Sequence, residues 1–280
     1  MLSKPTPTGK VTYYNKWSHD MSVWCNKDNS DIYQTLSPDT LKSFLKSSNI
    51  ENNEDINVVY DSYIANADSV LELGAGYGRV LETLLNKGYS GKLSCIERSD
   101  VFYKHLHGKF HPRVNIHHSD IALFQPKSKY DTILWFWSGF AEFSKEEQPQ
   151  ILSHVKSLLK ENGVLIIDTA LTRDNNGPLE SIIEINSEAN HRYFPTHKEL
   201  CSYALSLNLS IIDTIKYGIT TLRKIKYLYI FVNHNTLEDS QENNISSIDF
   251  TRTKNQKEKN MKTIINLLFN RRKAKPAMCM

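Results

Sequence analysis

The sequence predicts an α/β protein in which a parallel sheet is covered by helices on both faces. From about residue 68, short apolar runs rich in β-forming residues alternate with segments of helical periodicity, as is typical of parallel strands joined by helices. The last two apolar runs are only about eight residues apart, which is too few for a crossover helix. We therefore expect five parallel strands followed by a terminal antiparallel hairpin.

Each element has its own signal along the chain. The predicted parallel strands are 69–74, 92–97, 113–118, 131–137 and 163–168, and the hairpin strands are 209–217 and 226–234. Ser144 and Glu147 have capping-box spacing in front of one amphipathic segment, and Thr196 and Glu199 repeat it in front of another. Helical potential also occurs near 38–48. These signals place one helix before the sheet and two in its second half.

Two segments flank the domain that we expect at 66–234. Residues 1–65 are aromatic and polar, and we expect them to form an N-terminal lid or cap. Residues 235–280 are expected to be a polar linker and a basic amphipathic tail. Residues 251–280 contain nine Lys or Arg and one Glu, a net charge of +8, so the other 250 residues sum to −5 against +3 for the whole chain. The basic tail could contact an anionic surface or be a solvated extension, whereas the body is not built to hold nucleic acid.

Composition narrows the class of protein. The chain is 40% hydrophobic and 23% charged, which is ordinary for a globular protein. No apolar stretch approaches the roughly 18 residues of a transmembrane helix, and the N-terminus lacks the apolar region of a secretory signal. The four cysteines are scattered without CxxC spacing, so we expect them to be reduced. These features predict a cytoplasmic protein.

The segment "SVLELGAGYGRVLETLL" at 69–85 contains the strongest functional signal. Gly74, Gly76 and Gly78 lie between a predicted strand and a predicted helix, and Glu72 precedes them. Glycine allows positive φ and close approach of a ligand to the backbone, and the amides at a helix N-terminus favour anionic or polar groups. The spacing is G-x-G-x-G, with Arg79 where a dinucleotide-binding fingerprint would carry its last glycine.

The E-x-G-x-G-x-G motif resembles that of the class I S-adenosylmethionine-dependent methyltransferases, and the resemblance covers roughly residues 66–234. It implies a Rossmann-like sheet and S-adenosyl-L-methionine as cofactor, with no metal. By resemblance, Glu97 at the end of the second strand would accept hydrogen bonds from both ribose hydroxyls, and Asp120 and the Ile121 amide would contact the adenine. Arg98 departs from the family, because an apolar residue usually covers the adenine there; a guanidinium can stack on a purine instead. The cofactor-binding residues that we predict are Glu72, Gly74, Ala75, Gly76, Gly78, Glu97, Arg98, Asp120, Ile121 and Trp137.

The methyl acceptor should lie beyond the carboxyl ends of the strands. Three segments could reach it: the exit of the fourth strand at 135–143, a loop at 190–196, and residues 13–20 as part of the lid. Trp135 and Trp137 should alternate on the fourth strand, so that one of them faces the core. The candidate acceptor contacts are Tyr13, Tyr14, Trp17, Trp137, His191 and Tyr193, of which Tyr14, His191 and Tyr193 are the candidate catalytic groups. Each has a structural alternative, as a packing aromatic or a surface histidine.

The sequence lacks several signatures of other methyltransferases. The fourth strand is followed by neither N-P-P-Y nor D-P-P-Y, which mark enzymes that methylate amino groups of adenine, cytosine or glutamine, and by no Pro-Cys pair. The resemblance therefore implies transfer to a nitrogen or oxygen of a small molecule by in-line displacement. Two alternatives stay open: a methyltransferase of protein side chains recruited through the basic tail, and a non-catalytic ligand-binding protein of the same fold.

Overall fold

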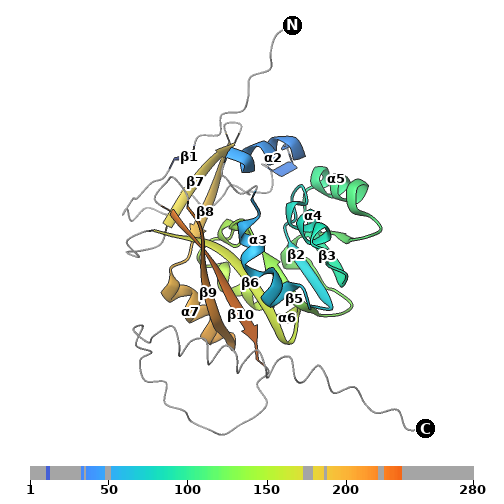
Figure 1. Cartoon of the computed structure of the whole chain (residues 1–280). Coiled ribbons are helices and arrows are strands. Elements are labelled where there is room, and N and C mark those ends of the chain that lie inside the picture. Colours follow the sequence, from blue (N-terminus) through green and yellow to red (C-terminus); the bar gives the residue numbers. More distant parts are fainter. Residues whose placement is uncertain are drawn as a thin grey trace, which may run out of the picture. The chain divides into compact units, whose positions relative to one another are not determined.

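The structure is a computed structural model, and it describes residues 11–12, 33–34, 36–47, 52–172, 179–185, 188–219 and 224–234 (Figure 1). The chain divides into two compact units, Met1–Asn235 and Thr236–Met280, and every described residue belongs to the first. The predicted basic tail and most of the predicted lid lie outside the described residues.

A seven-stranded sheet forms the centre of the first unit, with strand order β4-β3-β2-β5-β6-β10-β9. Its strands are β2 (Ser69–Leu73), β3 (Lys92–Glu97), β4 (Asn115–His118), β5 (Tyr130–Trp135), β6 (Leu159–Thr172), β9 (Leu209–Ile219) and β10 (Lys224–Asn233). The first five pair in parallel, and β10 pairs antiparallel with both β6 and β9. The predicted sheet of five parallel strands and a terminal hairpin is thus confirmed.

Helices cover both faces of this sheet (Figure 1). They are α2 (Pro38–Ser47), α3 (Glu54–Val59), η1 (Tyr60–Ile64), α4 (Arg79–Asn86), α5 (Asp100–Phe110), η2 (Ile121–Leu123), η3 (Gly139–Glu142), α6 (Gln148–Ser157) and α7 (His197–Ser206). One face packs against α3, η1, α4 and α5, and the other packs against α6 and α7. Alternate residues of β5 and β6 enter the two cores, as expected for strands buried on both sides.

Both predicted capping boxes form. The Thr196 side chain accepts from the Glu199 amide, and Glu199 accepts from the Thr196 amide, at the start of α7. Ser144 and Glu147 make the same reciprocal bonds, but α6 begins only at Gln148, so their box closes the turn in front of the helix. The spacing therefore predicted local hydrogen bonds correctly in both cases and the helix start in one.

A second, three-stranded sheet was not predicted. It has the order β1-β7-β8 and consists of β1 (Val11–Thr12), β7 (Leu179–Ile185) and β8 (Glu188–Phe194), all antiparallel. The prediction of a loop at 190–196 is therefore wrong for 190–194, which pair with β7. The segment "EANHRYF" carries few apolar residues and no clear alternation, so only its partner strands reveal it as a strand.

The predicted fourth strand also ends earlier than expected. β5 stops at Trp135, and Trp137 and Ser138 adopt φ values of 55° and 60°. Extended backbone cannot continue through two left-handed residues, so the expectation that Trp135 and Trp137 alternate on one strand is wrong. Trp135 is buried in the core against Phe140, whereas Trp137 lies in the turn beyond the strand.

Candidate functional site

The glycine turn joins β2 to α4, and its three glycines all have positive φ, between 55° and 88°. A Cβ at Gly78 would lie 2.4 Å from the Phe110 ring of α5, and one at Gly76 would lie 3.3 Å from Cδ2 of Leu41 in α2. At Gly74, by contrast, no described atom would lie within 4 Å, and this glycine is exposed. Two of the glycines thus serve packing, and the turn opens to the outside at Gly74.

Glu97 connects the end of β3 to this turn. One carboxylate oxygen, Oε2, accepts from the Gly76 amide at 2.8 Å, and the other, Oε1, accepts from the Ser99 amide at 2.8 Å. The side chain is almost fully buried, and burial raises its pKa, while the three backbone amides that it faces, the Ser99 amide foremost, act in the opposite direction. Each carboxylate oxygen can accept more than one hydrogen bond, so the group keeps acceptor capacity for a ligand.

Beside Glu97, the structure brings together the three residues that we predicted for the adenine. Arg98 donates from Nη1 to Asp120 at 3.0 Å, and Asp120 caps η2 by accepting from the Ala122 amide at 2.8 Å. β3 and β4 pair in parallel with Glu97 opposite His118, which places 120–121 next to Glu97 and Arg98. The Asp120 N-cap and a ligand contact are compatible, because each carboxylate oxygen has a second lone pair.

Glu72 lies at the end of β2 below the turn. Its side chain is 4% exposed, and its Oε2 has no hydrogen-bond partner among the described residues. Burial raises the pKa of Glu72 to about 8, while Arg79 opposes the shift. A buried polar atom without a partner is rare in folded proteins and marks a position where a ligand or water completes the hydrogen bonds.

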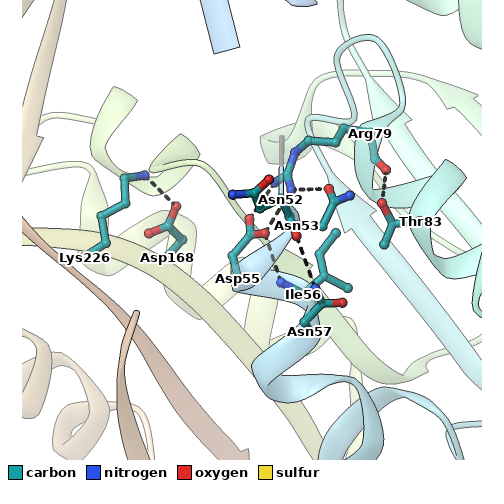
Figure 2. A network of polar contacts seen from close by, with 9 residues as sticks. All are labelled: Asn52, Asn53, Asp55, Ile56, Asn57, Arg79, Thr83, Asp168 and Lys226. Atoms are coloured by element: carbon teal, nitrogen blue, oxygen red, sulfur yellow. Dashed lines mark hydrogen bonds and ion pairs between the residues drawn. The ribbon is translucent and has the colours of Figure 1, made fainter. Parts of the chain in front are cut away.

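Arg79, the first residue of α4, is held by the segment that precedes β2. Figure 2 shows its guanidinium bound to both carboxylate oxygens of Asp55, at 2.9 and 2.5 Å, and to the Asn53 side chain at 3.0 Å. The ion pair is almost completely buried. It fixes the start of α4, and with it the glycine turn, to the N-terminus of α3.

The turn after β5 forms another side of the site. The Trp137 carbonyl accepts from Arg192 Nη1 at 3.5 Å, and the Arg192 guanidinium lies 5.5 Å from the centre of the Trp137 ring. Trp137 also packs against the buried cluster of Leu36, Leu41, Tyr77 and Phe102. Trp137 therefore lies between the glycine turn, the N-terminal segment and β8.

The candidate catalytic residues are not brought together in the described part of the chain. Tyr13, Tyr14 and Trp17 lie outside the described residues, and His191 is described only as a backbone position in β8, opposite Ile182. Tyr193 donates its hydroxyl to Glu199 at 2.6 Å. Because neighbouring residues of a strand point to opposite faces, Tyr193 faces α7 while Arg192 faces Trp137. The catalytic assignments remain predictions.

The described residues contain neither a candidate metal site nor a candidate membrane-spanning helix. No group of three or more His, Cys, Asp or Glu side chains there could hold a metal ion. The described helices also include none with the length and hydropathy needed to cross a membrane.

Comparisons with known proteins agree with this geometry. Residues 70–163 match the family model described as "Methyltransferase domain", and this range includes the glycine turn, Glu97 and Asp120. The 1,6-didemethyltoxoflavin-N1-methyltransferase of Burkholderia thailandensis superposes with a TM-score of 0.57 at 13% identity, over 81% of this chain and 96% of that chain. The chain has the class I methyltransferase fold.

A second solved structure supports the same methyltransferase fold. The glycopeptide N-methyltransferase MtfA complexed with S-adenosyl-L-homocysteine is 15% identical and superposes with a TM-score of 0.52, over 63% of this chain and 87% of that chain. The same enzyme complexed with S-adenosyl-L-methionine gives a TM-score of 0.53 at 14% identity, over 65% and 86% of the two chains. No curated protein matches the chain in sequence.

Sequence reasoning missed three residues of this methyltransferase fold that gather beside Trp137. Tyr33, Glu142 and Arg192 form one hydrogen-bonded cluster, although they lie far apart in the chain. None of the three was a candidate site residue in the sequence. No local pattern links the three, so only the tertiary structure could reveal the cluster.

Proposed function

We propose that the protein is an S-adenosyl-L-methionine-dependent methyltransferase that transfers a methyl group to a nitrogen or oxygen of a small molecule by in-line displacement. The observation that carries the proposal is the buried Glu97 carboxylate at the end of β3, bound to the Gly76 amide of the neighbouring turn. It supports the proposal because a carboxylate that could accept the ribose hydroxyls lies beside a glycine turn that opens outward at Gly74.

The residues present fit this cofactor. Glu97 would accept the ribose hydroxyls, and Arg98, Asp120 and the Ile121 amide would hold the adenine. Gly74 offers open space at the backbone, and the unpartnered oxygen of Glu72 would accept a hydrogen bond from the ammonium group of the methionine portion. When bound, the cofactor supplies a methyl group activated by a sulfonium. The chain's own task is then to bind and orient the two substrates and to exclude water, which requires no catalytic triad.

A small molecule is the acceptor class that the comparisons favour. The names of the two structural neighbours give a toxoflavin precursor and a glycopeptide as the compounds that those enzymes methylate. In this chain, Arg192 of β8 contacts Trp137 in the turn after β5, and we infer that an acceptor would bind on this side of Trp137. This region combines aromatic and charged side chains, as a pocket for a small polar compound requires.

Calorimetry of S-adenosyl-L-homocysteine binding tests the proposal. We expect micromolar binding to the wild type, and a loss of at least about 10-fold, or 1.4 kcal/mol, in Glu97→Gln, because an amide nitrogen cannot accept the ribose hydrogen bonds. Glu82→Gln is the matched control, since Glu82 is an exposed acid on α4 that pairs only with Lys109 in the described structure. Thermal unfolding of each variant shows whether a lost affinity reflects a lost fold. No binding by the folded wild type would refute the donor site.

A further inference from the structure

A buried polar cluster joins three segments that are distant in the chain. Tyr33 donates its hydroxyl to Glu142 Oε1 at 2.5 Å. Arg192 Nη2 donates to the same oxygen at 2.9 Å and to the Tyr33 hydroxyl oxygen at 3.1 Å. We refer to Tyr33, Glu142 and Arg192 as the latch. Its members come from the N-terminal segment, from η3 and from β8.

The latch is built from groups that are costly to separate. The Arg192 side chain is 4% exposed, so its charge requires a buried partner. Burial alone would lower the pKa of Arg192, but Tyr33 and Glu142 raise it, and the guanidinium stays charged. Burial and Glu142 together raise the pKa of Tyr33, which keeps the hydroxyl protonated as a donor. Arg192 is therefore a charged donor in the latch, and Tyr33 is a neutral one.

On one side, the latch holds the turn after β5. Two successive non-glycine residues with positive φ, Trp137 and Ser138, are strained and persist only where the surroundings hold them. Arg192 contacts both the carbonyl and the ring of Trp137. Trp137 lies at the carboxyl end of β5, the strand next to β2 and its glycine turn.

On the other side, the latch holds residues 33–34 and 36–41 over the predicted donor site. The Tyr33 carbonyl accepts from Ser99 Oγ at 2.9 Å, and the Gln34 side chain accepts from the Asp100 amide at 3.2 Å. Leu41 reaches within 3.3 Å of the position of a Cβ at Gly76. These contacts fall on the glycine turn and on the residues that immediately follow Glu97.

We propose that Arg192 is a positioning residue for methyl transfer, which fixes the Trp137 turn and, through Glu142 and Tyr33, keeps residues 33–34 and 36–41 closed over the bound donor. The inference rests on the proposed function, because it requires the donor to bind between the glycine turn and Glu97. It follows that the donor leaves only after the latch opens. Arg192 also couples the two sides of the site, because β8 lies beside η3 on the acceptor side.

The test measures closure directly, without a known acceptor. The dissociation rate of radiolabelled S-adenosyl-L-methionine is compared between the wild type and Tyr33→Phe, which removes one latch hydroxyl and leaves the ring. We expect dissociation about 5- to 10-fold faster, the size expected for losing one typical hydrogen bond. Arg192→Met should accelerate dissociation more than Tyr33→Phe does. Arg192→Lys, which keeps the positive charge, should accelerate it less than Arg192→Met. Tyr89→Phe is the matched control. It also removes one buried hydroxyl, which donates to the Ala67 carbonyl and is not part of the latch.

Hydrogen exchange of the ligand-free protein gives an independent readout. The amides of 38–47 should exchange faster in Tyr33→Phe than in the wild type, whereas those of α6 should not change. A variant that is only less stable would instead exchange faster in both helices, and this result would overturn the inference, as would unchanged exchange and dissociation. If the donor does not bind the wild type, the proposed function fails, while faster exchange at 38–47 would still support closure by the latch. If Arg192→Met does not fold, Tyr33→Phe and Arg192→Lys decide the outcome.

Discussion

Replacing Glu72 by Gln should change how the stability of the protein depends on pH. Glu72 is buried at the end of β2, beside Arg79 and Glu97, and one of its oxygens has no partner among the described residues. Burial raises its pKa, and the nearby guanidinium of Arg79 acts in the opposite direction. The substitution keeps the shape of the side chain and removes its ability to ionise. Its NH2 group donates as the protonated carboxyl does, so the variant mimics the neutral form of Glu72.

The size of the effect follows from the pKa of Glu72, which rises from 4.5 to about 8 on folding. Below pH 4.5 the carboxyl is protonated in both the folded and the unfolded state, and the stabilisation is fully present. As the pH rises from 4.5 to 8, the unfolded chain loses this proton while the folded protein keeps it. The free energy of unfolding should therefore fall by about 1.4 kcal/mol per pH unit in this window, and the loss is complete above pH 8 at no more than about 5 kcal/mol.

Urea unfolding followed by circular dichroism, at pH 5, 6, 7 and 8, measures this difference. The free energies of unfolding of Glu72→Gln and of the wild type should diverge by about 4 kcal/mol between pH 5 and pH 8, with the variant more stable at pH 8. Other titrating groups are common to both proteins and cancel in the comparison. Glu82→Gln serves as the control, because it makes the same chemical change at a solvent-exposed acid on α4.

Parallel curves for Glu72→Gln and the wild type would refute the reasoning. They would mean that Glu72 is ionised in the folded protein at neutral pH, so that attraction to Arg79 outweighs the cost of burial. The site would then present a fixed negative charge to the donor. A protonated Glu72, by contrast, must release its proton when it binds an ammonium group.

The other predictions concern the glycine turn and its support. Gly78→Ala should destabilise the fold by about 2–4 kcal/mol in urea unfolding. The new Cβ would lie 2.4 Å from the Phe110 ring, at a residue whose φ is +88°. An unchanged unfolding midpoint would contradict this packing. Gly74→Asn should cost less than about 1 kcal/mol, because asparagine tolerates this φ, yet it should weaken S-adenosyl-L-homocysteine binding by at least about 10-fold in calorimetry; full affinity would place the ligand elsewhere. Asp55→Ala should destabilise by about 3–5 kcal/mol, because it leaves the Arg79 charge buried without its main partner; a loss below 1 kcal/mol would show that Arg79 finds water instead.

Most of the central sheet could be predicted from the sequence because its strands are buried on both faces. Continuous apolar runs such as "SVLEL" and "DTILW" leave few alternatives to a strand in a parallel sheet. The strands β7 and β8 had no such signal, because β8 is polar along most of its length. Its pairing with β7, and that of β7 with β1, depends on contacts between segments far apart in the chain. The end of β5 was misplaced because nothing in "WFWSGF" predicts that Trp137 and Ser138, neither of them a glycine, adopt left-handed backbone conformations.

The donor side of the site could be predicted because it is made of strand ends in chain order. Gly76 and Glu97 follow adjacent parallel strands, so a spacing of 21 residues in sequence becomes a hydrogen bond of 2.8 Å. The latch could not be predicted in this way. Tyr33 lies 109 residues from Glu142 and 159 from Arg192, and no rule of local spacing connects them.

The three glycines of the turn have different physical reasons to be glycine, and the difference bears on whether the protein still binds a donor. Gly78 is required by Phe110, and Gly76 is crowded by Leu41, so both would be needed even in a protein that had lost its ligand. Gly74 has no described neighbour that requires it, and a positive φ alone does not explain it, since this chain places asparagine at positive φ at Asn53, Asn162 and Asn208. What asparagine could not provide is an unobstructed backbone. The glycine at 74 therefore argues for a ligand that passes close to the main chain, and against a turn that is only a remnant of a lost site.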